Sequence, residues 1–504
     1  MLQSISDPNI VNLNSDQLEQ QRNQASASQL RKLLVIAGLP IDNLTMEETL
    51  DRIEHFIEVG RQTGKTHQVA TVNADFVVKS TSDPELGYLI QSCDLATADG
   101  MPLVWGARKL GVDIKERVAG SDMVPLLAER AAQKGYSIYL YGASEGVAEK
   151  AGKILTENNP GLKIVGAVSP PFTPVIDVDK NLLDNIRNAK PDILLVALGN
   201  PKQEKFIGMY GPDLGVPVAI GIGGTLDFIS GKTVRAPRWM QRAGIEWFHR
   251  MLSDPKRLVK RYVHDLFGFS SFFFGQWRRL KTAQSEEVLL PESELILLNG
   301  KAILKLSGRL DVNNAEHLYT KFDAILSETY DVEVDLQDVS FIDSVSIGVL
   351  LAYAKQCREN GGNLKLINTP SNVYNSFKYL KMDRFFDIYQ AGKSTSEPEP
   401  YQTKRAQDLL IISMPKRIDT VTSKETLQHC IEAAQNCANI ILDFSNTRLV
   451  ASAGLALLVH LNEHLKERNG SLALANCSDE ISRTLELVKF DLLFPILEKL
   501  PQDK

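Results

Sequence analysis

Polar side chains follow two of the apolar runs in the first half of the chain. The run HQVATVNADF contains Thr71 and Asn73 near its end, and the run CDLATADGMP ends in Asp99, followed by Gly100. A carboxylate such as that of Asp99 can take the proton of a hydroxyl group while this group attacks an electrophile. A second interpretation stays open at this point: Asp99 and Gly100 form a turn, and Thr71 or Asn73 caps a helix.

Three further segments place donors or glycines after apolar runs. Arg117 lies in RVAGSD, Gln203 lies in LGNPKQEKF, and GIGGTLDFISG contains Gly223 and Gly224. Paired glycines allow backbone N–H groups to approach a phosphate. Each segment is unspecific by itself, but together they place polar or glycine-bearing segments at the ends of four or five consecutive apolar runs.

These residues need a scaffold that gathers them at one place. Over residues 29–280, short apolar runs such as SIYLYGA, DILLVALG and VPVAIGIGG alternate with amphipathic helical stretches such as SDMVPLLAERAAQKG. This alternation predicts an α/β fold, a Rossmann-like doubly wound parallel sheet covered by helices on both faces. Such sheets bind ligands at the carboxyl ends of their strands, where the candidate residues are expected.

The end of this first domain is basic and aromatic. The stretch VRAPRWMQRAGIEWFHR, residues 234–250, contains Trp239 and Trp247, and Trp277 follows in LFGFSSFFFGQWRR. Basic residues alternating with aromatic ones are typical of a helix in the headgroup layer of an anionic membrane. The alternative is a helix whose basic face is simply solvated.

Bulk composition limits the class of protein. The 504 residues carry a formal net charge of −6 and five cysteines. The net charge argues against nucleic acid as the main partner, and the scattered cysteines suit a reducing cytoplasm. No apolar run is long enough to cross a bilayer and no signal-peptide pattern begins the chain, so we expect a cytoplasmic protein with peripheral contact to the inner face of the membrane. No cofactor or metal is predicted: the pair Asp177 and Asp179 opens a helix, where capping is the expected role.

The last two hundred residues contain an internal repeat. Ser344 and Ser452 are 452 − 344 = 108 positions apart, and residues 332–368 align with residues 439–476. Each copy reads strand, loop, serine at a helix start, amphipathic helix, glycine turn and strand, which predicts two small α/β domains. The expected organisation is a disordered segment 1–28, a first domain 29–280, a linker 281–291, a small domain 292–392, a linker 393–405 and a small domain 406–504.

The ordered motifs TVNADF, ADGMPLVWG, RVAGSD, YGASEGVAEKA, LGNPKQE, GIGGTLDFISG and RAPRWMQRAGIEWFHRMLSDPKRLVKRY resemble the WecG/TagA/CpsF glycosyltransferases over about half of the chain. The resemblance implies transfer of a hexosyl unit, of the N-acetylmannosamine type, from a UDP-sugar to a polyprenyl-diphosphate-linked sugar. It makes Asp99 the catalytic base and places Thr71, Asn73, Arg117 and Gln203 around the substrate. It further implies a lipid-diphosphate site, formed by Arg250, Arg257, Lys260 and Arg261.

The repeated domains resemble STAS domains of anti-sigma-factor antagonists, with FIDSVSIGVLL in the first copy and LVASAGLALLV in the second. The regulatory phosphoserine of that family falls on Ser344, after Asp343, and the second copy has Ser452 after Ala451. A kinase or sigma-pathway partner is implied; the alternative is two scaffolds whose serines cap helices. For the whole chain, the second hypothesis is a non-catalytic sugar-nucleotide sensor in a partner-switching pathway.

Overall fold

The structure is a computed structural model, and its chain divides into two compact units. One comprises Met1–Phe172 with Asp179–Lys393, and the other Thr173–Val178 with Ser394–Lys504. The structure describes residues 32–171, 173, 175, 178–242, 245–253, 255–283, 293–298, 300–391, 401–406, 409–419, 422–435, 437 and 439–500.

A six-stranded sheet organises the first part of the first unit. Its strand order is β4-β3-β8-β7-β5-β6, and every neighbouring pair is parallel. The strands are β3 (His67–Val72), β4 (Leu95–Ala98), β5 (Ser137–Gly142), β6 (Lys163–Val168), β7 (Ile193–Ala197) and β8 (Val218–Gly221). The predicted parallel sheet is therefore confirmed.

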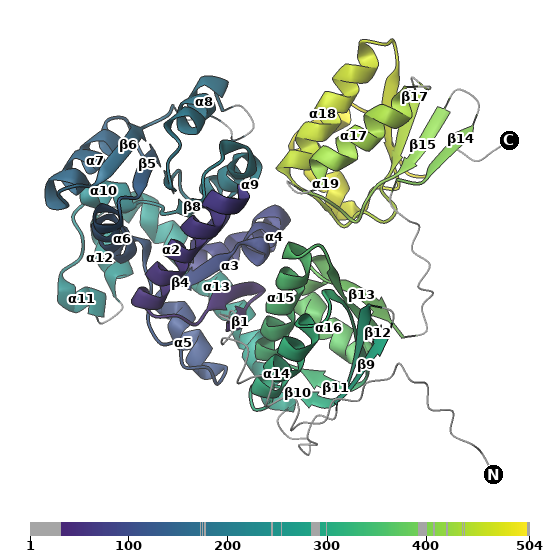
Figure 1. Cartoon of the computed structure of the whole chain (residues 1–504), viewed down its shortest axis with the longest axis horizontal. Helices are drawn as coiled ribbons and strands as arrows, with labels where there is room; N and C mark the ends of the chain where they lie inside the picture. The colour runs from purple at the N-terminus through teal and green to yellow at the C-terminus, as the bar shows by residue number, and fades with distance from the viewer. Residues whose placement is uncertain are drawn as a thin grey trace. The chain divides into compact units, whose positions relative to one another are not determined.

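Helices cover both faces of this sheet (Figure 1). Val69 of β3 belongs to one buried apolar cluster and its neighbour Ala70 belongs to another, as expected when successive side chains point to opposite faces. The helices are α2 (Met46–Thr63), α3 (Ala74–Ser82), α4 (Pro84–Ser92), α5 (Met101–Lys109), α6 (Gly120–Lys134), α7 (Val147–Asn158), α8 (Lys180–Ala189), α9 (Lys202–Leu214), α10 (Thr225–Ile229), α11 (Arg238–Arg242), α12 (Glu246–Ser253) and α13 (Pro255–Ala283).

An antiparallel hairpin, β1 (Leu33–Ile36) and β2 (Leu39–Asp42), precedes α2. Its side chains Leu34, Ile36 and Leu39 are buried in the same cluster as Ala70 and as Phe269 of α13. The hairpin and α13 therefore complete one face of the domain, although they come from its two ends.

The first small domain also belongs to the first unit. Its sheet has the order β13-β12-β11-β10-β9, with β9 antiparallel to β10 and the other pairs parallel. Its elements are β9 (Ser293–Leu298), β10 (Lys301–Leu310), α14 (Ala315–Leu326), β11 (Asp331–Ile342), α15 (Ser344–Glu359), β12 (Asn363–Thr369), α16 (Ser371–Tyr379), η2 (Met382–Arg384) and β13 (Asp387–Gln390).

The second unit repeats this architecture. Its main sheet has the order β14-β15-β17-β19-β20, and β16 pairs with β18 beside it. The elements are β14 (Thr403–Ala406), β15 (Leu409–Ser413), β16 (Arg417–Ile418), α17 (Ser423–Ala434), β17 (Asn439–Asp443), β18 (Leu449–Val450), α18 (Ser452–Lys466), β19 (Ser471–Ala475), α19 (Asp479–Leu487), η3 (Phe490–Leu492) and β20 (Ile496–Leu497).

The structure corrects the capping role expected of the two repeated serines and confirms the capping role expected at the start of α8. Ser344 and Ser452 are each the first residue inside a helix, and the N-caps are Asp343 and Ala451, so the prediction that these serines cap their helices is wrong by one position. Asp343 accepts hydrogen bonds from the backbone N–H groups of the two residues after Ser344. The capping role expected at the start of α8 is confirmed for Asp179, whose carboxylate accepts from the N–H of the second residue after it; Asp177 lies outside the described residues.

Candidate active site

Asn73 and Asp99 lie side by side at the carboxyl edge of the sheet. Val72 pairs with Ala98 in the register of β3 and β4, so the residues that follow both strands are neighbours. The N–H of Asp99 donates to the carbonyl of Val72 at 2.8 Å. Asp99 is half-buried, and Asn73 caps α3 by accepting from the N–H of Asp75. The capping interpretation therefore holds for Asn73, and Asp99 follows β4 at the same edge of the sheet.

Thr71 lies under the start of α6. Its hydroxyl donates to the carbonyl of Gly221 at the end of β8, at 3.1 Å. A Cβ at Gly120, the first residue of α6, would lie 3.5 Å from the Thr71 methyl group and 3.4 Å from the Thr225 hydroxyl. The start of α6 is therefore packed at van der Waals distance from Thr71 and Thr225.

Gln203 ties together the loops that follow β7 and β8. It is 1% exposed, and its side-chain oxygen accepts from the N–H of Gly199 at 3.2 Å and of Gly223 at 2.9 Å. Its amide nitrogen donates to Glu204 at 2.7 Å. The N–H of Gly223 is therefore engaged by Gln203, and Gly224, which is exposed, is the N-cap residue of the short helix α10.

Two buried acids adjoin these loops, and sequence reasoning did not select either as a site residue. Asp75 is 4% exposed, and its Oδ2 lies 2.9 Å from Lys79 Nζ, 3.0 Å from Asn200 Nδ2 and 3.2 Å from Arg261 Nη2. Glu204 is 1% exposed, and burial raises its pKa to about 7. Both acids lie inside motifs already quoted, TVNADF and LGNPKQE, but the residue types alone do not tell a buried carboxylate from an exposed one.

The guanidinium group of Arg117 lies among acidic side chains. It lies 3.0 Å from Asp122 and 3.7 Å from Glu246 of α12, and Arg235 approaches Asp122 at 2.7 Å. Two arginines and two carboxylates thus form a compensated cluster at the start of α6. An anionic ligand near Arg117 would compete with Asp122 and Glu246 for its guanidinium.

The appendage α11–α13 reaches the site through Arg261, which lies at Asp75 and also 3.6 Å from Asp265. Lys260 is exposed, whereas the side chains of Arg250 and Arg257 are outside the described ones. The appendage also exposes a row of large apolar side chains, namely Trp239, Trp247, Phe248, Leu252, Val259, Val263, Leu266, Phe267 and Phe274.

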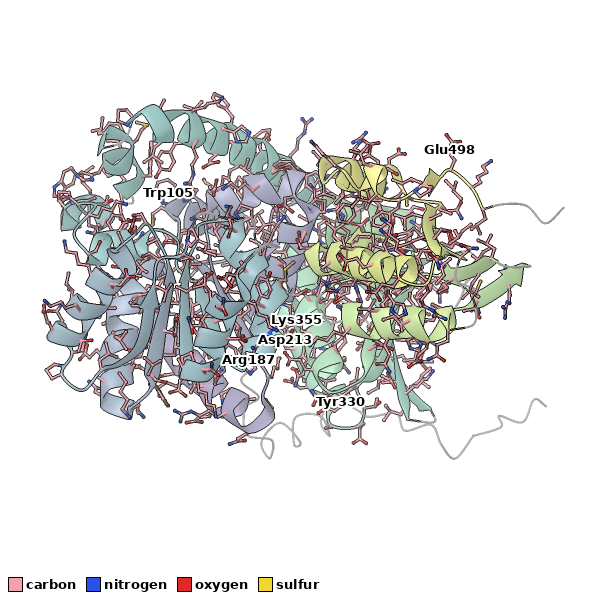
Figure 2. The ribbon with its side chains drawn as sticks, turned by 90° about the horizontal axis from the view of Figure 1, so that it is seen from above. Trp105, Arg187, Asp213, Tyr330, Lys355 and Glu498 are labelled. Carbon is pink, nitrogen blue, oxygen red and sulfur yellow. The ribbon has the colours of Figure 1, made fainter. Side chains whose placement is uncertain are left out.

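Trp105 of α5 adds one more exposed aromatic side chain, at 47% (Figure 2). Its neighbour Gly106 packs on α13, since a Cβ there would lie 3.2 Å from the Phe273 ring.

Within the described part of the chain, no helix has the length and apolar character needed to span a membrane. The described residues also contain no group of three His, Cys, Asp or Glu side chains placed to hold a metal ion.

We expect Glu204→Gln to raise the melting temperature at pH 8 by about 7–14 °C. The pKa rises from 4.5 to about 7 on folding, each pKa unit is worth about 1.4 kcal/mol, and each kcal/mol moves Tm by about 2–4 °C. The folded protein keeps this proton up to about pH 7, whereas the unfolded chain loses it near 4.5. Stability therefore falls as pH rises between these values and stays lower above pH 7. Thermal unfolding at pH 5 and pH 8 checks this.

The effect of Glu204→Gln should shrink to about a quarter at pH 5, where the wild-type carboxyl is neutral in the folded state and the unfolded chain has lost only part of its proton. Glu157→Gln is the control, because its side chain is 60% exposed. Equal Tm differences at both pH values for Glu204→Gln would contradict a buried carboxyl that titrates near neutrality.

The comparisons with known proteins match separate parts of the chain. The model of the Glycosyl transferase WecG/TagA/CpsF family matches residues 34–283, and the STAS domain model matches residues 292–394 and 400–502. The chain is 32% identical over 224 residues to the N-acetylglucosaminyldiphosphoundecaprenol N-acetyl-beta-D-mannosaminyltransferase of Bacillus subtilis, covering 44% of this chain and 84% of the relative. A protein of the same name from Bacillus spizizenii is 30% identical over 189 residues, covering 38% and 72%.

Two solved structures each match about a fifth of the chain. A putative anti-sigma factor antagonist from Thermotoga maritima is 19% identical, with a TM-score of 0.19, covering 20% of this chain and 87% of that one. The anti-sigma factor antagonist SpoIIAA in its unphosphorylated form is also 19% identical, with a TM-score of 0.18, covering 19% of this chain and 87% of that one.

Proposed function

Because the chain belongs to the WecG/TagA/CpsF glycosyltransferase family and carries two STAS domains, we propose that it transfers a hexosyl unit from a UDP-sugar to a polyprenyl-diphosphate-linked sugar. The names of the two Bacillus relatives support an N-acetylmannosamine-type donor and an N-acetylglucosamine-bearing lipid acceptor. The observation that carries the proposal is the position of Asp99, half-buried beside Asn73 at the carboxyl edge of the sheet.

In the proposed reaction, an acceptor hydroxyl attacks the anomeric carbon of the donor sugar. The new C–O bond forms there, the bond from that carbon to UDP breaks, and Asp99 takes the proton of the hydroxyl. UDP leaves with the bonding electron pair, and Arg117 offsets the charge that develops on its diphosphate. Thr71 and Asn73 line the pocket, and Gln203 holds the two loops that face it.

The appendage α11–α13 is the proposed place of contact with the lipid acceptor and the membrane. Arg250, Arg257, Lys260 and Arg261 would contact the diphosphate of the acceptor, and the exposed aromatic and aliphatic side chains of α11–α13 would enter the headgroup layer. The protein would then work at the inner face of the membrane through peripheral contact. The tandem STAS domains would regulate the transferase or dock a protein partner, with Ser344 and Ser452 as candidate phosphorylation sites.

A panel of UDP-sugars, assayed with a polyprenyl-diphosphate-N-acetylglucosamine analogue, tests the proposal. UDP release that depends on the acceptor and is fastest with UDP-N-acetylmannosamine is the expected result. Binding of a UDP-sugar without acceptor-dependent release would favour the alternative, a sugar-nucleotide sensor.

We expect EDTA to leave this transfer unchanged to within about twofold, because the steps above use side chains alone. The assay is repeated after dialysis against EDTA and again after addition of Mg²⁺ or Mn²⁺. A strong loss of activity that either ion restores would show that charge on the leaving UDP is offset by a metal instead.

A further inference from the structure

The transferase domain and the first STAS domain form one compact unit, and a single face of α15 makes much of the contact between them. Ser344, Gly348 and Lys355 are spaced by four and seven residues, so they project within about 40° of one another around this helix. A Cβ at Gly348 would lie 2.3 Å from the carbonyl oxygen of Leu33 in β1. The helix thus approaches the β1–β2 hairpin as closely as a glycine allows.

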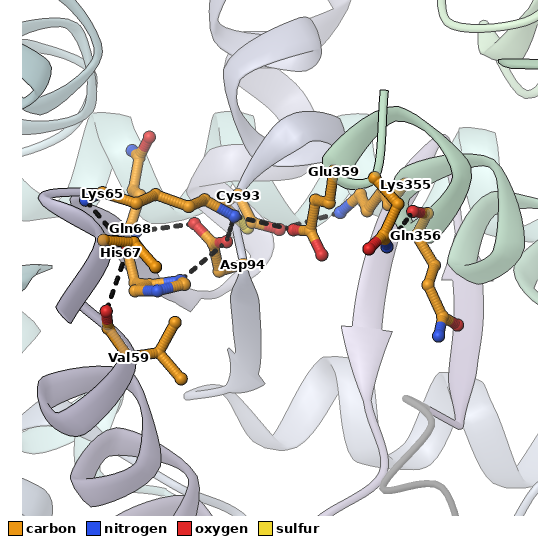
Figure 3. A network of polar contacts seen from close by, with 11 residues as sticks. Val59, Lys65, His67, Gln68, Cys93, Asp94, Lys355, Gln356 and Glu359 are labelled. Carbon is orange, nitrogen blue, oxygen red and sulfur yellow. Dashed lines mark hydrogen bonds and ion pairs between the residues drawn. The ribbon is translucent and has the colours of Figure 1, made fainter. Parts of the chain in front are cut away.

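Polar contacts follow the same face toward the end of α15 (Figure 3). Lys355 is 9% exposed, and its ammonium group donates to the carbonyl of Cys93 at 2.8 Å. Glu359 lies 2.8 Å from Lys65, which also lies 2.9 Å from Asp94. Burial alone would lower the pKa of Lys65, but these two carboxylates raise it, so the ammonium group is held charged between the two domains.

A second set of contacts comes from α16 and η2. The Lys381 ammonium group donates to the carbonyl of Thr81 at the end of α3, at 2.9 Å. The Tyr379 hydroxyl donates to the carbonyl of Phe272 in α13 at 3.0 Å, and the Arg279 guanidinium lies 4.1 Å from the centre of the Tyr379 ring. The first STAS domain therefore touches both the core of the transferase domain and its appendage.

The hairpin and the appendage are also joined to each other. Gln276 of α13 donates to the carbonyl of Val35 at 2.9 Å and accepts from the N–H of Ala37 at 2.8 Å. The same helix carries Arg261 to Asp75 at the candidate active site. A domain that presses on β1 and on α13 together can thus influence where Arg261 lies.

The second repeat lacks the residues that make this contact possible. Position 348 + 108 = 456 is Ala456, and position 355 + 108 = 463 is Glu463. A methyl group and an acid therefore replace the glycine that meets Leu33 and the lysine that meets Cys93. In the second repeat, Leu487 stands at the position of Tyr379, and its side chain is 84% exposed. The surface that fits the transferase domain belongs to the first repeat.

We infer that the first STAS domain is an intramolecular clamp of the transferase domain, which docks through the Ser344-bearing face of α15 and holds α13 with Arg261 at the active site. Ser344 is 8% exposed, and we expect opening of the clamp to make it more accessible to a kinase. A phosphate there would add about −1.5 to −2 charges next to Asp343 and oppose closing. The effect on catalysis rests on the proposed function, whereas the clamp itself does not.

Gly348→Ala in the full chain tests the clamp. Alanine favours a helix over glycine by about 1 kcal/mol, so α15 itself should not be weakened, but the new methyl group collides with Leu33. Amide hydrogen exchange should speed up by about tenfold or more in β1 and in the middle of α13, while β11 stays protected. Transfer to the lipid acceptor should fall about fivefold or more, with UDP binding unchanged.

Three further variants complete the experiment, and a fourth is held in reserve. Gln356→Ala, on the half-exposed side chain after Lys355, is the control that should leave exchange and transfer at wild-type values. Ser344→Glu should reproduce the faster exchange of Gly348→Ala, and Ser344→Ala should not. If β11 also lost protection in Gly348→Ala, Lys355→Glu, which copies the second repeat, would replace it.

Hydrogen exchange tests the clamp, and the transfer assay tests the proposed function, so either hypothesis can be contradicted without the other. Unchanged exchange in β1 and α13 for both Gly348→Ala and Lys355→Glu would overturn the clamp, whatever the enzyme does. Faster exchange in a protein that shows no transfer with any UDP-sugar would support the clamp and contradict the proposed function.

Discussion

Asp99→Asn is expected to lower the rate of sugar transfer by a factor of about 10²–10⁴, because the amide keeps the size of the side chain but cannot take the proton of the acceptor hydroxyl. The loss should appear in kcat with a lipid-linked or a short soluble acceptor alike. UDP should still bind with nearly wild-type affinity, since the proposed contacts to the diphosphate come from Arg117. Steady-state kinetics with calorimetric UDP titrations separate the two quantities.

Asp113→Asn is the matched control for this variant. Asp113 lies on the same domain, but its side chain is 84% exposed and pairs with Arg108. We expect this change to leave kcat at the wild-type value. Equal activity of Asp99→Asn and wild type, in a protein with unchanged Tm, would remove Asp99 from the mechanism.

The double variant Leu266→Glu/Phe267→Glu is expected to weaken binding to anionic vesicles by a factor of about 10²–10⁴. The two side chains are 60% and 73% exposed on α13, and burying each in the headgroup layer is worth about 1.5–3 kcal/mol. Transfer to a lipid acceptor in vesicles should fall with binding, whereas a short soluble acceptor should be used nearly as well as by the wild type. Vesicle sedimentation at several salt concentrations measures the binding.

Leu487→Glu provides the control for this variant, because Leu487 is 84% exposed but lies on α19 in the second STAS domain. Wild-type binding should also weaken as salt increases, since exposed charges are screened beyond about 8–10 Å at physiological ionic strength. Binding that ignores both salt and the α13 substitutions would contradict a role for the appendage at the membrane.

The sheet and the repeat could be predicted from the sequence because their signals are local. Runs such as DILLVALG are apolar at nearly every position, as is required of strands that are buried on both faces, and they form parallel strands. Polar residues directly after β3 and β4 were expected at the carboxyl edge of the sheet, and Asn73 and Asp99 lie there; that they are neighbours follows from the pairing of β3 with β4. The constant spacing of 108 residues likewise predicted two copies of one small fold.

The contacts of the basic tail could not be predicted in the same way. The run of lysines and arginines shows that α13 is basic, but not that Arg261 turns toward the buried carboxylate of Asp75. Nor does residue type reveal that Glu204 is enclosed beside Gln203 and keeps a proton near neutral pH. Both depend on helices that pack from distant parts of the chain.

The docking of the first STAS domain is a similar case. Lys355 and Cys93 are 262 positions apart, and no periodicity in the sequence relates α15 to the β1–β2 hairpin. Gly348 could have drawn notice, because glycine inside a helix is unfavourable and often marks a close approach. The sequence alone, however, does not say that the approaching group is the backbone of Leu33.

Mass spectrometry of the lipid product tests the central proposal most directly. The full chain is incubated with UDP-N-acetylmannosamine and a polyprenyl-diphosphate-N-acetylglucosamine acceptor, and both the lipid and the released UDP are measured. A glycosyltransferase should add one N-acetylhexosamine unit to the lipid for each UDP released, and Asp99→Asn should make little of this product. Saturable binding of the UDP-sugar with an unchanged lipid would contradict the proposal and identify the first domain as a sensor.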